Sequence, residues 1–173
     1  TIKGGDTVSF KCGDVFYGRI YPPCKNDTLN ATVYTSYGSG AKPVISQYKT
    51  AINDVWERVE NGIFYGGIWR MDLTNINNFT GNITDIDTNV GFIKVDGVIC
   101  PRKCFSIESL KNQWDFYNDD KYVYVKSERE PSAVASDIKF ACNIHCMKFT
   151  NNVIVENIVF MGTGAHGLQG TVH

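Results

Sequence analysis

The chain has 173 residues, which is the usual size of one domain. Its 17 basic and 18 acidic residues give a net charge of −1, so it lacks the basic excess of proteins that bind nucleic acids or anionic membranes. The longest uncharged stretch, residues 157–173, is interrupted by four glycines and polar residues, which excludes it as a membrane-spanning helix. Sixteen Ile and 16 Val stand against 4 Leu and 7 Ala, and this β-branched excess predicts a mostly β protein.

Alternation of polar and apolar residues predicts many short strands separated by Gly and Asn turns. In chain order we expect strands at residues 6–12, 15–17, 19–21, 31–36, 44–46, 62–71, 90–98, 121–126, 137–141, 147–149 and 153–160. One short helix is expected at residues 106–113, with Ser106 as its N-cap. An all-β sandwich and a β-solenoid both fit this spacing.

The end of the chain favours a solenoid. Residues 152–160 read NVIVENIVF, in which Ile and Val would face inward and stack on a neighbouring rung while Asn turns the corners. This pattern is typical of a parallel β-helix.

Five stretches resemble the N-terminal part of secreted right-handed parallel β-helix proteins of the pectate-lyase-like superfamily. They are GDTV with GDVFYG (residues 5–8 and 13–18), SYGSGAKP (36–43), NVGFI (89–93), QWDFY (113–117) and GAHGL (164–168). Each is a turn flanked by strands, and together they follow the order of the family along nearly the whole chain.

The resemblance implies one right-handed parallel β-helix domain over residues 1–173, with decorated N-terminal strands and loops at 1–130 and the first regular rungs at 131–173. Family members continue for many more rungs, so we expect the chain to be truncated at its C-terminus and possibly at its N-terminus. An uncovered rung would expose Ile and Val side chains and unpaired backbone groups.

The resemblance also implies an extracellular protein, secreted or at the cell surface, that acts on or binds a polysaccharide. The parent protein would be a polysaccharide lyase or a glycoside hydrolase, and the alternative is a noncatalytic surface or adhesin-type glycan-binding protein. Because the family's catalytic groove lies on central rungs, we expect this piece alone to be inactive. Neither a nucleic acid nor an inserted membrane is expected as a partner.

A lyase of this kind would use Ca²⁺ to neutralise a uronic acid and a base to remove the adjacent proton. The candidate metal ligands are Asp85, Asp87 and Asn89, which alternate along the chain and could therefore share one face of a strand. Solvated turn residues are the alternative interpretation.

Paired carboxylates are the tool of glycoside hydrolases. Asp115 is the candidate catalytic carboxylate, and Trp114, Asp119 and Asp120 are candidate substrate-binding residues, because an aromatic ring stacks on a sugar and carboxylates accept its hydroxyl groups. The alternative is that Trp114 is a core anchor and that the two later aspartates form a turn.

His166 lies between small residues that leave its ring accessible, and it matches a His-Gly pair of the family. It is therefore a candidate acid or base, and a structural histidine at a corner is the alternative.

Six cysteines form three locally spaced pairs, which predicts disulfides in an exported protein. The pairs are Cys12 with Cys24, Cys100 with Cys104, and Cys142 with Cys146. Zinc binding by the later cysteines with His145 is weaker, since three residues separate each pair instead of two. Sequons at Asn26, Asn30, Asn78 and Asn82 are candidate glycosylation sites.

Overall fold

The computed structural model describes residues 2–22, 30–51, 55–59, 67–76, 90–149 and 152–170. The described chain is all-β with a few short helical turns, and its sheets are both parallel and antiparallel. It divides into two compact units, of which the first comprises Thr1–Gln47 with Ile144–His173 and the second comprises Tyr48–Asn143. The chain passes from the first unit to the second after Gln47 and returns to the first unit at Ile144.

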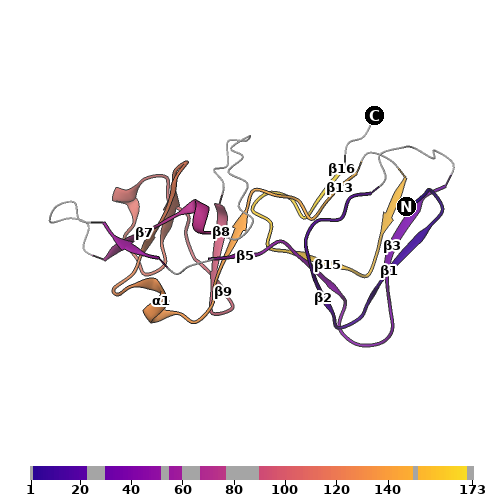
Figure 1. Ribbon diagram of the computed structural model, residues 1–173, viewed down its shortest axis with the longest axis horizontal. Helices are drawn as coiled ribbons and strands as arrows, with labels where there is room; N and C mark the ends of the chain where they lie inside the picture. The colour runs from indigo at the N-terminus through magenta and orange to yellow at the C-terminus, as the bar shows by residue number, and fades with distance from the viewer. Residues whose placement is uncertain are drawn as a thin grey trace. The chain divides into compact units, whose positions relative to one another are not determined.

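Three parallel sheets build the first unit (Figure 1). The first contains β1 (Thr7–Lys11), β3 (Thr32–Tyr37) and β14 (Val153–Val155). The second contains β2 (Val15–Tyr17), β4 (Val44–Ser46) and β15 (Val159–Met161). The third pairs β13 (Met147–Phe149) with β16 (Leu168–Gly170), and Ile20 forms a parallel bridge to Met147.

Each sheet takes its strands from three successive passes of the chain. The first pass runs through β1, β2 and Ile20; the second through β3, β4 and β13; the third through β14, β15 and β16. The second unit is inserted in the second pass, between Ser46 and Met147. Strands more than 100 residues apart in sequence therefore lie side by side, as the purple and yellow segments of Figure 1 show.

Stacked apolar side chains fix the register of these passes. Phe16 pairs with Ile45, which pairs with Phe160, so one aromatic or aliphatic residue from each pass enters the same ladder. Asn152 and Asn157 have φ values of 39° and 56°, in the left-handed region that Asn tolerates better than most residues. The sequence prediction that Asn turns these corners is confirmed.

The second unit has two antiparallel four-stranded sheets. One has the order β10 (Phe116–Asn118), β11 (Tyr122–Lys126), β7 (Ile68–Asp72) and β6 (Glu57–Arg58), and we call it the tyrosine sheet. The other has the order β5 (Lys49–Thr50), β12 (Ile138–Cys142), β8 (Val90–Val95) and β9 (Val98–Ile99). Two 3₁₀ turns, η1 (Leu73–Asn75) and η2 (Ile107–Ser109), and one helical turn, α1 (Pro131–Val134), complete the unit.

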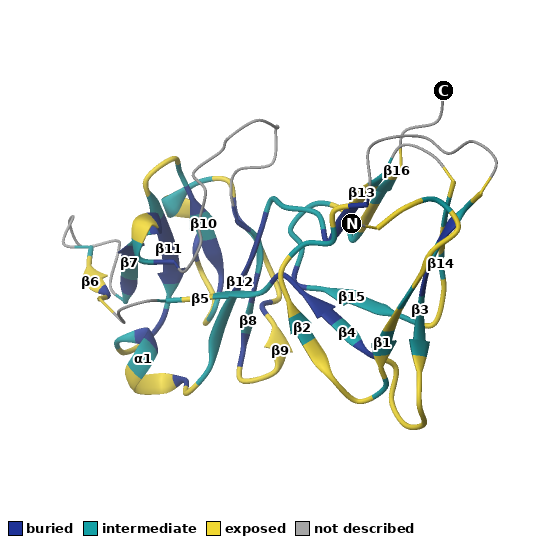
Figure 2. Ribbon diagram, turned by 45° about the vertical axis from the view of Figure 1, so that its right-hand side comes forward, coloured by how far each residue is buried: buried dark blue, intermediate teal, exposed yellow. Residues whose placement is uncertain are grey.

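The core of this unit is shared by the two sheets. Met71, Val123 and Val125 of the tyrosine sheet cluster with Ile93 and Phe140 of the other sheet. The buried residues of β11, β7, β8 and β12 form the dark-blue segments of these strands in Figure 2. The arrangement is that of a β-sandwich.

The expected parallel β-helix is shown only in part, because both sheets of the second unit are antiparallel. Polar and apolar alternation is the same for parallel and antiparallel strands, so it did not reveal the direction of pairing. The turn at Asp96 and Gly97, with φ values of 44° and 85°, divides the strand expected at residues 90–98 into the hairpin β8–β9. The helix expected at residues 106–113 is only the 3₁₀ turn η2, and Ser106 makes no side-chain capping bond there.

The expected disulfides are not formed by the described cysteines, because Cys12, Cys100, Cys104, Cys142 and Cys146 are all free thiols. Cys100 belongs to the core between the sheets, whereas Cys104 packs in a separate cluster with Ile68, Leu110 and Tyr124. Cys142 and Cys146 belong to different units. Cys24 lies outside the described residues.

Candidate functional site

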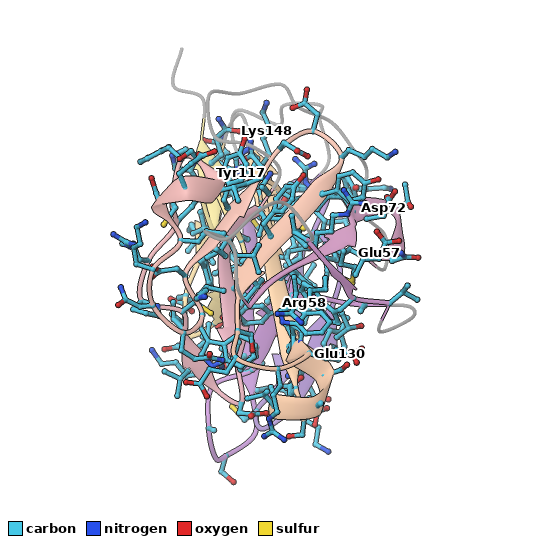
Figure 3. The ribbon with its side chains drawn as sticks, turned by 90° about the vertical axis from the view of Figure 1, so that its left-hand side faces the viewer. Glu57, Arg58, Asp72, Tyr117, Glu130 and Lys148 are labelled. Carbon is cyan, nitrogen blue, oxygen red and sulfur yellow. The ribbon has the colours of Figure 1, made fainter. Side chains whose placement is uncertain are left out.

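A row of large polar and aromatic side chains crosses the outer face of the tyrosine sheet. Cross-strand pairing joins Tyr117 to Tyr124, Tyr124 to Arg70, and Arg70 to Glu57. Figure 3 labels Tyr117 and Glu57, which come from the two outermost strands of this sheet. The inner neighbours of these residues fill the core, so the row faces away from it.

The aromatic rings of this face contact one another and two cations. The rings of Tyr117 and Tyr124 are stacked with their centroids 5.7 Å apart, and the ring of Tyr122 meets that of Tyr124 edge-on at 6.1 Å. The Arg70 guanidinium lies 4.5 Å from the centroid of Tyr122, and Lys121 Nζ lies 5.0 Å from it. Arg70 is also paired with Glu57 at 2.9 Å. These contacts hold the tyrosine rings in fixed positions.

A pocket of about 670 Å³ opens beside the tyrosines, and we call it the tyrosine pocket. Its lining consists of four aromatic residues, two aspartates, two lysines, one cysteine and one asparagine: Lys103, Cys104, Phe105, Tyr117, Asn118, Asp119, Asp120, Lys121, Tyr122 and Tyr124. This volume is typical of a small-molecule site. All of these residues belong to the second unit.

One wall of the pocket is the segment that follows the edge of β10. Lys103 forms a parallel bridge to Phe116, and the backbone N–H of Cys104 donates to the Phe116 carbonyl at 2.7 Å. The next residue, Phe105, is 90% exposed. A phenylalanine ring held at a pocket rim with almost no protein contact is a surface on which a ligand can stack.

Asp115 fastens this wall to the sheet. Its side chain is 1% exposed and its Oδ2 accepts hydrogen bonds from Arg102 Nη2 at 2.5 Å and from the backbone N–H groups of Lys111 and Asn112, both at 2.9 Å. Burial raises the pKa of Asp115, but hydrogen bonds from Arg102, Asn112 and Lys111 outweigh burial and hold this pKa below its usual value. The carboxylate is ionised and its oxygens are occupied by these donors, and a catalytic role for Asp115 stays a prediction.

The two aspartates at the β10–β11 turn differ in their bonding. Asp119 Oδ1 accepts from the backbone N–H groups of Lys121 at 2.8 Å and Tyr122 at 2.6 Å, while its Oδ2 accepts from the Tyr124 hydroxyl at 3.0 Å. Asp120 is exposed, and no hydrogen bond to its side chain is found among the described residues. Asp120 is therefore the pocket carboxylate that can accept a hydrogen bond from a ligand.

Two of the pocket phenols, those of Tyr117 and Tyr124, remain protonated. Burial, together with the hydrogen bond to Asp119, raises the pKa of Tyr124 to about 12. Burial and the negative charge of Asp119 also raise the pKa of Tyr117. Both hydroxyl groups are neutral at ordinary pH, so the charges of the pocket are those of its two lysines and two aspartates.

Of the residues that the sequence proposed for substrate binding, Asp119 and Asp120 line the tyrosine pocket. Trp114 does not, because it lines a smaller apolar pocket of about 240 Å³ with Val98, Ile99 and Val134. Sequence analysis missed Phe105 and the three tyrosines. The alternating Tyr122-Val123-Tyr124 could have indicated them, since residues two apart in a strand share a face.

His166 belongs to the first unit, whereas the residues of the tyrosine pocket belong to the second. Its side chain is exposed, its backbone carbonyl lies 3.2 Å from His145 Nδ1, and the two imidazole rings are 5.5 Å apart. Asp115 belongs to the other unit. A catalytic role for His166 stays a prediction.

Several predicted sites fall on residues that the structure does not describe. The candidate calcium ligands Asp85, Asp87 and Asn89 lie outside the described residues, as do the sequon residues Asn26, Asn78 and Asn82. Asn30 is described and exposed. Within the described parts of the chain, no group of three or more His, Cys, Asp or Glu side chains could hold a metal ion. None of the helices described there is long and apolar enough to cross a membrane.

Comparison with known proteins places the fold and not the function. No protein-family model and no curated protein matches the chain. The structure is similar to that of XylC solved in complex with xylose, with a TM-score of 0.57, and the likeness covers 94% of this chain. Sequence identity is 14%, so the likeness supports a β-helix-like fold alone. The chain spans only 31% of the length of XylC.

Proposed function

We propose that the chain is the glycan-binding part of an extracellular carbohydrate-active protein, and that the tyrosine pocket holds a neutral sugar. The observation that carries this proposal is the 90% exposed ring of Phe105 at the rim of a pocket with three tyrosines and an unbonded carboxylate. Aromatic rings stack on the apolar face of a pyranose, and carboxylates and phenols bond its hydroxyl groups.

The charge of the pocket favours a neutral ligand. Lys103 and Lys121 are balanced by Asp119 and Asp120, so the lining has no excess charge to attract a uronate or to repel it. The xylose bound to XylC is a neutral sugar, and it is the first ligand to test.

We further propose that the first unit is the beginning of a parallel β-helix. Three passes of the chain contribute one strand each to three parallel sheets, which is the arrangement of stacked rungs. The likeness to XylC supports this assignment. Four sequons and a polysaccharide ligand would both suit an exported protein.

Binding is favoured over catalysis for this part of the chain. The described pocket residues include two carboxylates, Asp119 and Asp120. Both oxygens of Asp119 accept internal hydrogen bonds, so Asp120 is the one carboxylate of this lining that a ligand can use. A glycosidase needs two carboxylates, one on each side of the bond. Lyase or glycosidase activity would then belong to a longer parent protein.

The test is calorimetric titration of the full chain with xylose and with xylo-oligosaccharides. Phe105→Ala removes the stacking ring and Asp120→Asn the free carboxylate, and each is expected to weaken binding about fivefold to tenfold. Tyr37→Ala is the matched control, because Tyr37 is also an exposed aromatic residue but belongs to β3 of the first unit. Saturable binding that is lost equally in Tyr37→Ala and Phe105→Ala would refute the site.

A panel of other neutral oligosaccharides extends the experiment beyond xylose. Binding of any of them that depends on Phe105 supports the pocket as a glycan site. If no oligosaccharide of the panel gives a heat of binding in calorimetry or a change in the NMR chemical shifts of the pocket tyrosines, the proposed function is wrong.

A further inference from the structure

Two histidines occupy the same corner of successive passes in the first unit. Met147 of β13 pairs with Leu168 of β16, and the two strands run parallel to each other (Figure 1). His145 and His166 each precede their paired residue by two positions, so the register places them side by side. The backbone N–H of Met147 donates to the Gly167 carbonyl at 3.2 Å, which holds the two corners together.

The two imidazole rings lie at a distance that suits two ligands of one metal ion. Their centroids are 5.5 Å apart and their planes make an angle of 31°. An ion bound tetrahedrally to two imidazoles, with N–metal bonds of about 2.0–2.1 Å, holds the ring centroids roughly 5 Å apart. His145 and His166 can therefore share an ion with little movement.

The hydrogen bond of His145 leaves one of its ring nitrogens available. Its Nδ1 lies 3.2 Å from the backbone carbonyl oxygen of His166. A carbonyl oxygen only accepts, so Nδ1 carries the proton of this bond, and in the neutral ring Nε2 keeps its lone pair. Metal-ligating histidines are oriented in this way, by donating their second N–H to a carbonyl or carboxylate.

The two rings are accessible from outside the unit. His166 is exposed and His145 is half-buried. Among the described residues, none makes a hydrogen bond to the ring nitrogens of His166. An ion that approaches the pair meets one oriented imidazole and one that no described side chain occupies.

The neighbouring thiol does not belong to this pair. Cys146 is fully buried, and its Sγ faces the backbone carbonyls of Ile45 and Met161 at 3.5 and 3.7 Å. Alternation along the strand thus turns His145 outward and Cys146 inward. The ligand set is two imidazoles, and not the cysteines and histidine that the sequence brought together.

We propose that His145 and His166 chelate one divalent transition-metal ion of the kind that prefers imidazole, namely Zn²⁺, Ni²⁺ or Cu²⁺, and that this ion clamps β13 to β16. Ca²⁺ and Mg²⁺ prefer oxygen ligands, and segments 144–149 and 159–170, which carry the pair, contain neither Asp nor Glu. The remaining coordination positions are open to water or to a further ligand. The inference does not use the tyrosine pocket and does not depend on the proposed function.

The first experiment is calorimetric titration of the full chain at pH 7.5 with Zn²⁺, Ni²⁺ and Cu²⁺, in a buffer that does not bind metals. At least one of these ions is expected to bind with a stoichiometry of one, and an excess of Ca²⁺ is expected not to displace it. Displacement by Ca²⁺, or no binding of any of the three ions, would overturn the proposal.

Matched variants locate the site. His145→Gln and His166→Gln are each expected to lower the affinity at least about tenfold, because one imidazole cannot chelate. The controls are His173→Gln, which removes the third histidine of the chain, and Cys12→Ser, which removes a thiol that is only partly buried. Both controls should stay within about twofold of the unaltered chain, and losses equal to those of the paired histidines would refute the site.

Two measurements on the unaltered chain do not depend on the folding of a variant. Substoichiometric Cu²⁺ is expected to broaden the NMR signals of the His145 and His166 rings before those of His173. Bound Zn²⁺ is expected to slow hydrogen exchange of the Met147 N–H, which lies between β13 and β16. Broadening of His173 first would contradict the site, and unchanged exchange would contradict the clamp.

Phe105→Ala separates this inference from the proposed function. The variant is expected to bind the metal ion as the unaltered chain does, because Phe105 belongs to the other unit. Metal binding that is lost with Phe105 and kept without His166 would overturn the histidine site and leave the sugar-binding proposal to its own test.

Discussion

The hydroxyl of Tyr124 donates a 3.0 Å hydrogen bond to Oδ2 of Asp119, which ties the middle of β11 to the turn that precedes it. The other oxygen of the same carboxylate accepts two backbone N–H groups within that turn. Asp119 therefore fixes both the hairpin and the orientation of a pocket tyrosine.

Asp119→Ala is expected to lower the free energy of unfolding of the second unit by about 2 kcal/mol, since it removes three hydrogen bonds to a charged acceptor. Asp120→Ala is its neighbour control and is expected to change stability by less than about 0.5 kcal/mol, because Asp120 is exposed. Urea unfolding followed by tyrosine fluorescence measures both. Equal stabilities would show that the turn does not need its carboxylate.

Arg102 and Asp115 support the opposite wall of the pocket, and their pair depends on pH. The pKa of folded Asp115 is lowered, so this carboxylate stabilises the fold above the pKa of the unfolded chain, near 4, and the contribution is lost as the pH falls through the folded pKa. Asp115→Asn is expected to cost about 2 kcal/mol at pH 7 and to flatten the acid limb of the stability profile.

Measurement of unfolding midpoints between pH 7 and pH 2 checks this expectation. Asp137→Asn serves as the control, because the Asp137 side chain is 41% exposed and its ion pair with Lys139 is accessible to solvent. If stability fell equally steeply with decreasing pH in Asp115→Asn and in the unaltered chain, the lowered pKa of Asp115 would be contradicted.

Local structure was predictable from the sequence where one residue type determines it. The Ile and Val ladders and the left-handed Asn152 and Asn157 follow from packing and from backbone sterics, so the strands and corners of residues 147–160 were anticipated. The single strand expected at residues 153–160 is instead two strands of different sheets, β14 and β15, separated by the corner that contains Asn157.

Strand direction and the inserted unit were not predictable in the same way. The pairing of β11 with β7 joins segments about 50 residues apart, and nothing in YVYVK or IWRMD states whether the pairing is parallel. Only part of the pocket lining was anticipated, because the sequence does not show which distant segments pair. Asp119 and Asp120 adjoin a tyrosine strand in sequence, but Phe105 reaches them only through the pairing of Lys103 with Phe116.

The described cysteines should behave as thiols of very different reactivity. Burial raises the pKa of Cys100 and Cys142 to about 12 and that of Cys146 to about 11, so these groups stay protonated at pH 8. The thiolate is the reactive form, so their alkylation in the folded protein is expected to be slow, while Cys12 is less buried and is expected to react first.

Intact mass after timed iodoacetamide treatment without reductant measures this order, and peptide mapping assigns the modified sites. Denaturation at pH 8 should make all five described thiols react within the same period. A mass that stays short of five alkylations in denaturant would show that some of these cysteines are in disulfides.

Gly67 occupies a position beside β7 that a larger residue cannot take. Its φ is +80°, and a Cβ atom there would lie 2.7 Å from the backbone carbonyl oxygen of Ser127, whose own N–H donates to the Gly67 carbonyl at 2.7 Å. Gly97 has nearly the same φ, +85°, with nothing within 4 Å of the added atom. Gly97→Ala is therefore expected to cost about 1 kcal/mol from the backbone alone, and Gly67→Ala about 3 kcal/mol, because the clash is with backbone that cannot move aside. Urea unfolding of the two variants compares them directly, and equal losses would show that the junction between Gly67 and Ser127 adapts to the methyl group.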